Sequence, residues 1–252
     1  MDAQTTGLAS RLRHAVNEQT PASTLLRTGA LLMFLLLSGN ISSARAQGFQ
    51  LGIDFTTVIP KGEFSQNITN NGYGIGGQFL VGVSRLPISV GFDGAFTTYG
   101  SEEHKEPIST TIPELRVKVR TNNNIALMHV LVRAMPRRGA VRPYLDGLVG
   151  FKYLFTDTTI LNDANDEELA STKNLSDTTS SYGVGGGVQV RLGGFGRRGD
   201  ICLDGRVRYL AGGHADYLKK GSIRREDSNV FFDVLSSRTN VLTVQAGITF
   251  RF

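Results

Sequence analysis

The side chains most able to do acid–base chemistry in this chain are its histidines. Of 4 in the sequence, His104, His129 and His214 lie in the part that carries the strand pattern described below. An acyl-transfer or hydrolytic centre needs a histidine close to a serine and an orienting carboxylate. No serine follows any of the three by one or two residues within a candidate strand. We therefore predict no catalytic residue, and an enzyme acting on lipid through His129 or His214 stays as an alternative.

An acidic run and a glycine run are the other patterns that could bind a ligand. Asp163, Asp166, Glu167 and Glu168 cluster in a candidate loop. Their spacing lacks the turn glycine and terminal glutamate of a dedicated calcium loop. The glycine run at 183–187 has no helical pattern after it, and a dinucleotide site needs a helix start to bind the pyrophosphate. We predict neither a metal site nor a cofactor.

Charged residues also occur at alternate positions within apolar segments. If those positions face the inside of a domain, the charges must pair, because an unpaired buried charge costs roughly several kcal/mol. Acidic and basic residues are nearly balanced there, which indicates a salt-bridged plug, with a thin ion-conducting path as the functional alternative. The predicted network consists of Asp54, Asp93, Asp146, Lys152, Arg191, Asp204, Arg206, Arg208 and Arg251.

Eight segments with period-2 alternation would position these charges. They lie near residues 49–56, 73–83, 88–97, 114–134, 145–153, 182–192, 201–209 and 242–252. Each has one apolar face, as a half-buried β-strand does; the phase of the segment at 114–134 is the least clear. Glycines gather on the polar face, where the interior of a narrow barrel needs small residues.

The lengths of segments and connections predict the fold class. Strands of roughly 9–13 residues suit tilted strands that cross a membrane. Connections near 85–87, 135–141 and 193–200 are short, whereas those near 59–72, 100–113, 156–180 and 212–240 are long. We predict an all-β fold, an eight-stranded antiparallel up-and-down transmembrane β-barrel. If the apolar face pointed inward instead, the chain would be a soluble exported, lipocalin-like barrel for an apolar ligand. Aromatic residues at strand ends would form interfacial girdles: Tyr73, Tyr99, Tyr153, Phe155, Tyr182, Tyr209 and Phe252.

The first 46 residues have the composition of an export signal. An apolar run at 29–38 is too short to cross a bilayer as a helix but has the length of a signal-peptide core. Ala44-Arg45-Ala46 fits a cleavage site before Gln47. We predict a signal peptide at 1–46 and a barrel at 47–252. A buried helix in place of the signal, or an internal translation start near Met33, stays as an alternative.

Two motifs carry a resemblance to a known family. The chain ends in Val241-Leu-Thr-Val-Gln-Ala-Gly-Ile-Thr-Phe-Arg-Phe252, with Leu242, Val244, Ile248, Phe250 and Phe252 at alternate positions, and it contains Arg142-Pro-Tyr-Leu-Asp-Gly-Leu-Val-Gly-Phe151. Both resemble segments of the outer membrane β-barrel domain family, the small eight-stranded barrels such as the OmpA transmembrane domain and OmpX. The resemblance implies a Gram-negative outer-membrane location. It also implies that outer-membrane lipid, the barrel-assembly machinery and periplasmic chaperones are partners, with the C-terminal residues as the assembly signal.

Charge and composition exclude some functions. The net charge is +5 with a pI near 9.5, but lysines and arginines are scattered and their short runs fall in candidate turns and loops. We therefore predict no nucleic-acid binding. The single cysteine, Cys202, rules out an intramolecular disulfide. The predicted function is a structural, adhesive or recognition role in which the long loops contact an extracellular ligand. The soluble carrier, a narrow channel and the lipid enzyme are the alternatives.

Overall fold

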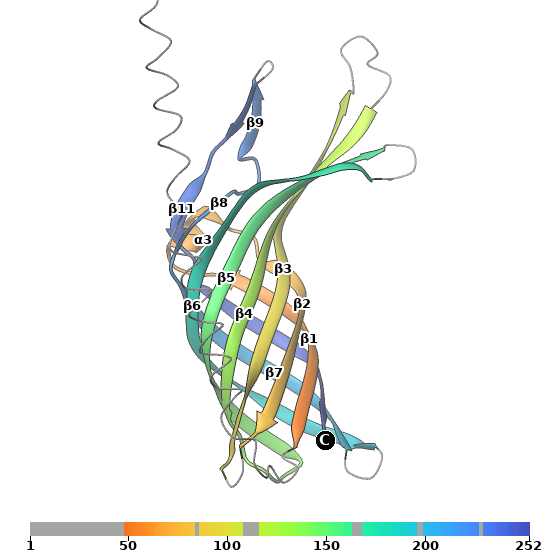
Figure 1. The fold of residues 1–252 in the computed structure, drawn as a ribbon, viewed down its shortest axis with the longest axis vertical. Helices are drawn as coiled ribbons and strands as arrows, with labels where there is room; N and C mark the ends of the chain where they lie inside the picture. The colour runs from red at the N-terminus through yellow and green to blue at the C-terminus, as the bar shows by residue number, and fades with distance from the viewer. Residues whose placement is uncertain (1–47, 84–85, 108–115, 163–167, 196–198, 227–228) are drawn as a thin grey trace, which may run out of the picture. The chain divides into compact units, whose positions relative to one another are not determined.

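The chain forms a closed antiparallel β-barrel in the computed structural model (Figure 1), which describes residues 48–83, 86–107, 116–162, 168–195, 199–226 and 229–252. Each barrel strand pairs with its neighbours in the sequence, and the last closes on the first, so the predicted eight-stranded up-and-down topology is confirmed. The barrel strands are β1 (Phe49–Pro60), β2 (Gly72–Gly82), β3 (Ile88–Pro107), β4 (Arg116–Ala134), β5 (Val141–Asn162), β6 (Glu168–Phe195), β7 (Gly199–Gly212) and β12 (Val241–Arg251).

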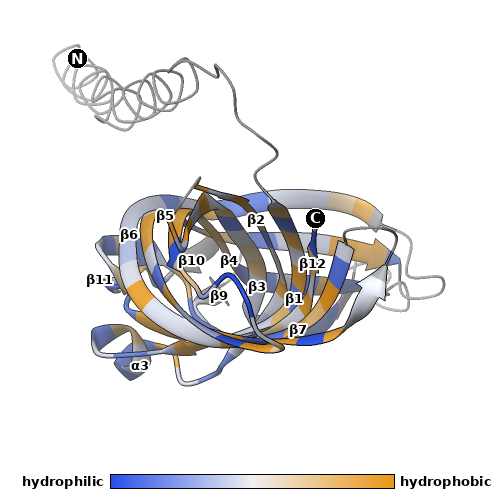
Figure 2. Cartoon of the chain, turned by 90° about the horizontal axis from the view of Figure 1, so that it is seen from below, coloured by the Kyte–Doolittle hydropathy of each residue, from blue (hydrophilic) through white to orange (hydrophobic). Residues whose placement is uncertain are grey.

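The two faces of the barrel wall differ in polarity. On β1, Leu51, Ile53 and Phe55 are 46%, 64% and 55% exposed, whereas Gly52 and Asp54 between them are buried. Hydrophilic and hydrophobic colours alternate along the strands in Figure 2. The apolar face is the outer one, and the alternative with the apolar face inward is therefore wrong.

Several strands are much longer than the sequence pattern predicted. β3, β5 and β6 have 20, 22 and 28 residues and continue beyond the barrel at its long-loop end (Figure 1). β4 also continues there, but its 19 residues agree with the segment predicted at 114–134. The loops expected near 100–113 and 156–180 are therefore strand over most of their described residues. We call residues 100–107, 116–124, 156–162 and 168–180 the strand extension. β2 pairs with β3 only up to Thr98, and β7 pairs with β6 only from Ser181, so this part of the sheet is open.

Short elements occupy the other two long connections. The connection near 59–72 contains α3 (Glu63–Asn67), and that near 212–240 contains β8 (His214–Tyr217), β9 (Ile223–Glu226), β10 (Asn229–Phe232) and β11 (Leu235–Arg238). β8 pairs with β11 and β9 with β10. Among the described residues, no helix has the length and apolar character needed to span a membrane.

An aromatic cluster closes the barrel interior at the long-loop end. Phe64 of α3 contacts Tyr217 of β8 edge to face at 4.9 Å between ring centroids, and Tyr99 of β3 lies 6.0 Å from Phe64. All three side chains are buried. The Tyr99 hydroxyl donates to the Leu218 carbonyl at 3.0 Å. Tyr99 was expected in an outer girdle; it points inward instead, because it continues the series of alternate β3 positions that face the interior, after Ala95 and Thr97.

The seam of the barrel joins the two ends of the described chain. β1 and β12 pair from Gln50↔Arg251 to Pro60↔Val241. The Phe49 and Phe252 rings stack at 4.3 Å beside this seam. Val244 and Ile248 of β12 and Phe252 just after it are exposed, while Leu242 and Phe250 are half-buried. Ala44, Ala46 and Gln47 lie outside the described residues, so the signal peptide stays a prediction.

Candidate functional site

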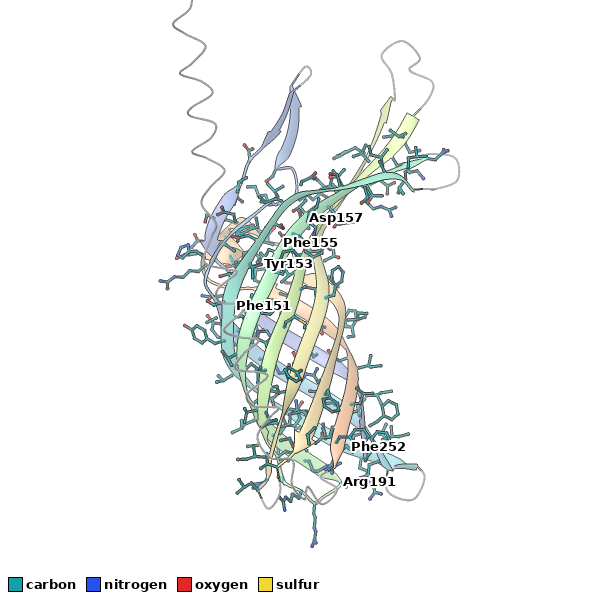
Figure 3. The ribbon with its side chains drawn as sticks, viewed as in Figure 1. Phe151, Tyr153, Phe155, Asp157, Arg191 and Phe252 are labelled. Atoms are coloured by element: carbon teal, nitrogen blue, oxygen red, sulfur yellow. The ribbon has the colours of Figure 1, made fainter. Side chains whose placement is uncertain are left out.

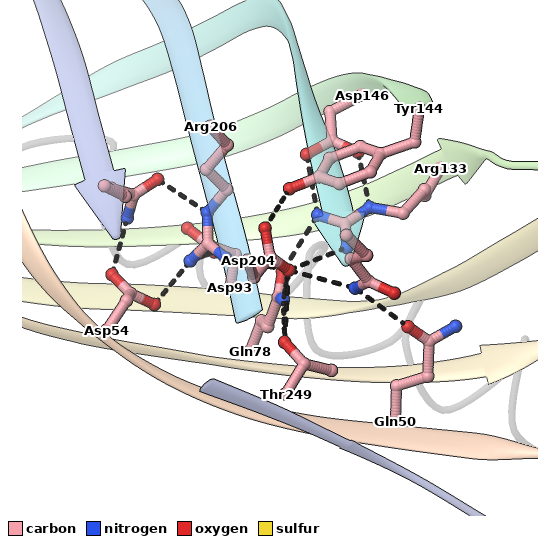
Figure 4. A network of polar contacts seen from close by, with 12 residues as sticks. Gln50, Asp54, Gln78, Asp93, Arg133, Tyr144, Asp146, Asp204, Arg206 and Thr249 are labelled. Carbon is pink, nitrogen blue, oxygen red and sulfur yellow. Dashed lines mark hydrogen bonds and ion pairs between the residues drawn. The ribbon is translucent and has the colours of Figure 1, made fainter. Parts of the chain in front are cut away.

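A layer of ion pairs crosses the barrel interior (Figure 4). Arg133 of β4 binds Asp146 of β5 through two hydrogen bonds, Nε–Oδ1 at 2.7 Å and Nη2–Oδ2 at 2.9 Å. Arg208 of β7 reaches the same carboxylate, with Nη2 2.7 Å from Oδ2, and its Nη1 lies 2.8 Å from Asp93 of β3. One carboxylate therefore accepts bonds from two arginines on different strands.

The second part of this layer surrounds Arg206. Its guanidinium pairs with Asp54 of β1 and lies 3.7 Å from Asp93 and from Asp204. Gln245 of β12 accepts from Arg206 Nε at 2.9 Å and donates to Asp54 at 3.1 Å. Arg206 therefore connects β1, β3, β7 and β12 through side chains.

Asp204 is the acceptor at the centre of the layer. The Tyr144 hydroxyl donates to its Oδ1 at 2.5 Å, and Gln78, Gln189 and Thr249 donate to its Oδ2 at 2.9–3.1 Å. The Arg133 guanidinium lies 3.7 Å above the Tyr144 ring. Such charge-assisted hydrogen bonds are about twice as strong as neutral ones. We call the seven charged residues the lumen layer: Asp54, Asp93, Arg133, Asp146, Asp204, Arg206 and Arg208.

The lumen layer is closed to solvent. Its charged side chains in ion pairs are 0–4% exposed. Glycines on the neighbouring strand make room for these bulky groups: a Cβ at Gly185 would lie 2.4 Å from Cγ of Arg208, and one at Gly187 would lie 2.5 Å from the Tyr144 hydroxyl. Since no side-chain atom of the layer has an appreciable water-accessible surface, its packing disfavours the alternative of a thin conducting path.

Three basic residues of the predicted network have other positions. Lys152 is fully buried, but its Nζ donates to the carbonyls of Leu210 and Thr239 at 3.2 and 2.5 Å rather than to a carboxylate. Arg191 is outside the network: its side chain is 51% exposed and pairs with Asp200 at the short-turn end, where a register shift follows it. Arg251 is half-buried and has no ion pair among the described residues.

Sequence reasoning missed Arg133 and the uncharged members of the network. Arg133 lies on the segment whose phase was unclear. β4 is apolar on both faces, with Ile125, Leu127 and Leu131 buried and Met128 and Val130 exposed. Apolar and polar residues therefore do not alternate along β4, so the sequence does not show which face Arg133 is on. The pairing of β4 with β5 places Arg133 opposite Asp146.

A buried histidine–serine pair lies beside the lumen layer, since His129 of β4 is the register partner of Asp93. His129 Nε2 is 2.8 Å from Ser181 Oγ on β6, and both residues are at most 4% exposed. No spacing rule could have found this pair, because its members are 52 residues apart. His129 Nδ1 has no partner among the described residues, so the carboxylate of a catalytic triad is not in contact with it.

The remaining sequence candidates do not come together. His104 and His214 are exposed on β3 and β8. Asp163, Asp166 and Glu167 lie outside the described residues, and Glu168 is the first residue of β6. In the described ranges, no group of three or more His, Cys, Asp or Glu side chains has the arrangement of a metal site.

Hydrogen bonds between polar side chains connect the strands of the extension. Asp157 of β5 accepts from Asn124 and Asn122 of β4 at 2.5 and 3.4 Å. The hydroxyls of Thr121 and Thr158 lie 2.9 Å apart, and Asn174 of β6 donates to Thr158 at 2.7 Å. These side chains are half-buried or exposed, apart from Asn124.

The outer wall changes from apolar to polar where the extension begins. Along β5, Phe151, Tyr153 and Phe155 are followed by Asp157, as Figure 3 shows. Two other strands make a similar change, although not in the same register: Phe96 to Thr98 on β3, and Tyr182 to Ser180 on β6, where Ser180 lies opposite Phe151.

No family model matches the sequence, and a search of curated proteins gave no match. Similar solved structures include Neisserial surface protein A (14% identity, 82% of this chain and 98% of that chain, TM-score 0.38). They also include Yersinia pestis outer membrane protein Ail (14%, 82% and 100%, 0.34) and E. coli outer membrane protein W (17%, 83% and 100%, 0.35). Since these TM-scores are below 0.5, the fold described above rests on strand pairing and burial alone.

Proposed function

We propose that this chain is an integral outer-membrane β-barrel protein whose loop-end strands carry a structural, adhesive or recognition role. One observation carries the proposal: large apolar side chains are exposed on every barrel strand, while the charges of the lumen layer are buried. Soluble monomers rarely expose contiguous apolar patches larger than roughly a few hundred Å². Exposed examples, one from each strand, are Leu51, Ile75, Phe92, Val130, Val149, Val188, Leu203 and Val244.

A bilayer would match this surface in both chemistry and geometry. A closed barrel satisfies the backbone hydrogen bonds between its strands and leaves no unpaired edge for the hydrocarbon. The change from aromatic to polar side chains above Phe155 fits one membrane boundary. On this proposal the long-loop end is extracellular, the short turns are periplasmic, and the alternating residues before Phe252 are read by the barrel-assembly machinery.

The interior and the extension support a role other than transport. A sealed lumen layer favours a structural barrel, whereas the extension presents exposed side chains beyond the proposed membrane boundary. We infer that contacts with an extracellular ligand are made by the extension and the β8–β11 region. Cells displaying a chain shortened between Ser101 and Asn122, which are register partners, should lose adhesion while the barrel still forms.

Membrane insertion is tested by fractionating cells that express the chain and by gel migration with and without boiling. We expect recovery in the outer membrane and a shift on boiling. A matched pair on β6 sharpens the test. We call the exposed apolar and aromatic side chains on the outer wall of the barrel the belt. Val188→Arg, in the belt, should block insertion because a cation facing lipid near the midplane costs about 2–4 kcal/mol. Thr172→Arg, in the extension, should leave it intact. Recovery of the wild type in the periplasm, or equal tolerance of both changes, would overturn the proposal.

A further inference from the structure

The cation of Lys173 occupies an unusual place on the outer wall. Lys173 lies on β6 opposite Asp157 of β5, inside the strand extension. Its side chain runs back toward the barrel, where Nζ donates to the Tyr153 hydroxyl at 2.9 Å. Nζ also lies 5.2 Å from the ring centroids of both Tyr153 and Phe155. The ammonium therefore contacts the last aromatic residues of the belt.

The acidic residue opposite Lys173, Asp157, does not hold this cation. Both oxygens of Asp157 accept bonds from Asn122 and Asn124. No ion pair joins Lys173 to a described carboxylate, in contrast to Arg120 in the same sheet, which pairs with Glu103 at 2.8 Å. An ammonium has three N–H donors, and the described contacts use one of them. Because Lys173 is exposed, the other two can reach a group outside the protein.

We infer that Lys173, with Tyr153 and Phe155, binds the phosphate of a lipid headgroup in the outer leaflet. This inference rests on the proposed membrane location and names a partner for the upper edge of the belt. Aromatic rings at a membrane interface lie at headgroup level, and the cation–π contacts hold the ammonium at that level. A phosphate accepts charge-assisted hydrogen bonds from an ammonium. The acyl chains of the same lipid would lie along Phe151 and Val149 below, which are both exposed.

The test measures lipid binding by the full chain in detergent micelles, using native mass spectrometry. The probe is dioleoyl phosphatidic acid; dioleoylglycerol supplies the same acyl chains without phosphate, and inorganic phosphate supplies the anion without the chains. We expect Lys173→Gln to weaken phosphatidic acid binding about fivefold, the upper range for an exposed ion pair. Lys173→Arg should retain binding, and Tyr153→Phe should give a smaller loss because the rings remain.

Lys219→Gln is the matched control, since it removes an equal charge from an exposed lysine beyond β8. Its binding of phosphatidic acid should equal that of the wild type. Unchanged binding by Lys173→Gln, an equal loss in Lys219→Gln, or equal affinity for inorganic phosphate and phosphatidic acid would each overturn the inference. Boiling-dependent migration of every variant shows that the barrel is folded. A wild-type chain that is absent from the outer membrane would instead contradict the proposed function.

Discussion

The lumen layer and the strand extension both join neighbouring strands through polar side chains, but they differ in burial and charge. In the lumen layer, Arg133 and Asp146 have side chains with no exposed surface. In the extension, Arg120 and Glu103 form a similar pair at 44% and 41% exposure. Burial raises both the attraction between charges and the cost of leaving one unpaired. Removing one partner of an ion pair should therefore strongly lower the stability of the barrel in the lumen layer and hardly change it in the extension.

The largest expected difference in the free energy of unfolding is between two Asp→Asn variants of β5, one in the lumen layer and one in the extension. Asp146→Asn removes the charge that two buried arginines share, and should lower the free energy of unfolding by about 3–5 kcal/mol. Asp157→Asn, in the extension, should change it by about 1 kcal/mol or less, since its partners are neutral amides. Urea unfolding in vesicles, followed by loss of the fast-migrating band, measures both. Equal losses would contradict the comparison.

The sequence predicted the barrel better than its ends. Alternation places Asp54, Asp93, Asp146 and Asp204 on one face because each lies between outward apolar residues, and that face is the buried one. The parts of the extension at 100–107, 156–162 and 168–180 were predicted as loops, and they contain Asn, Asp and Ser, which are depleted in strands. Side-chain bonds nevertheless join these strands, such as the one that Asn174 donates to Thr158. Propensity describes single residues and contains no information on cross-strand partners.

The candidate site was only partly predictable for a related reason. Whether a charged residue occupies an odd or an even position in its strand predicts which face it is on. Its partner depends on the register between strands and on the length of its side chain. Arg191 has the correct parity and still lies outside the lumen layer, because β6 and β7 change register just beyond it. Tyr144 and Gln78 carry no charge to mark them, although both bind Asp204.

A smaller difference should follow from removing one hydroxyl in each region. Tyr144→Phe leaves Asp204 without its shortest hydrogen bond inside the barrel, and should cost about 1–3 kcal/mol. Thr158→Val, of similar shape in the extension, should stay within about 0.5 kcal/mol of the wild type. Thermal unfolding of both variants in the same detergent gives the comparison. A Thr158→Val loss as large as that of Tyr144→Phe would show that the extension is as tightly coupled as the lumen.

The smallest effect should come from the exposed pair. Glu103→Gln should change the free energy of unfolding by about 0–1 kcal/mol, and the difference should vanish at high salt because exposed charges are screened. The loss in Asp146→Asn should persist in the same salt, since its partners are buried. Urea titrations at low and high ionic strength check both. A salt-resistant effect of Glu103→Gln would indicate that the extension is shielded from solvent.

The seam between β1 and β12 has a consequence for the order in which the molecule can form. Gln50 pairs with Arg251, so the ring closes only with the last strand of the chain. A ribosome delivers β12 after the other seven barrel strands, and any chain without β12 has an open sheet with unpaired edges. Closure therefore requires that β12 has been synthesised. A chain that stops before Val241 would lack β12, the strand that pairs with β1, and could not close the barrel even if its other seven strands paired correctly.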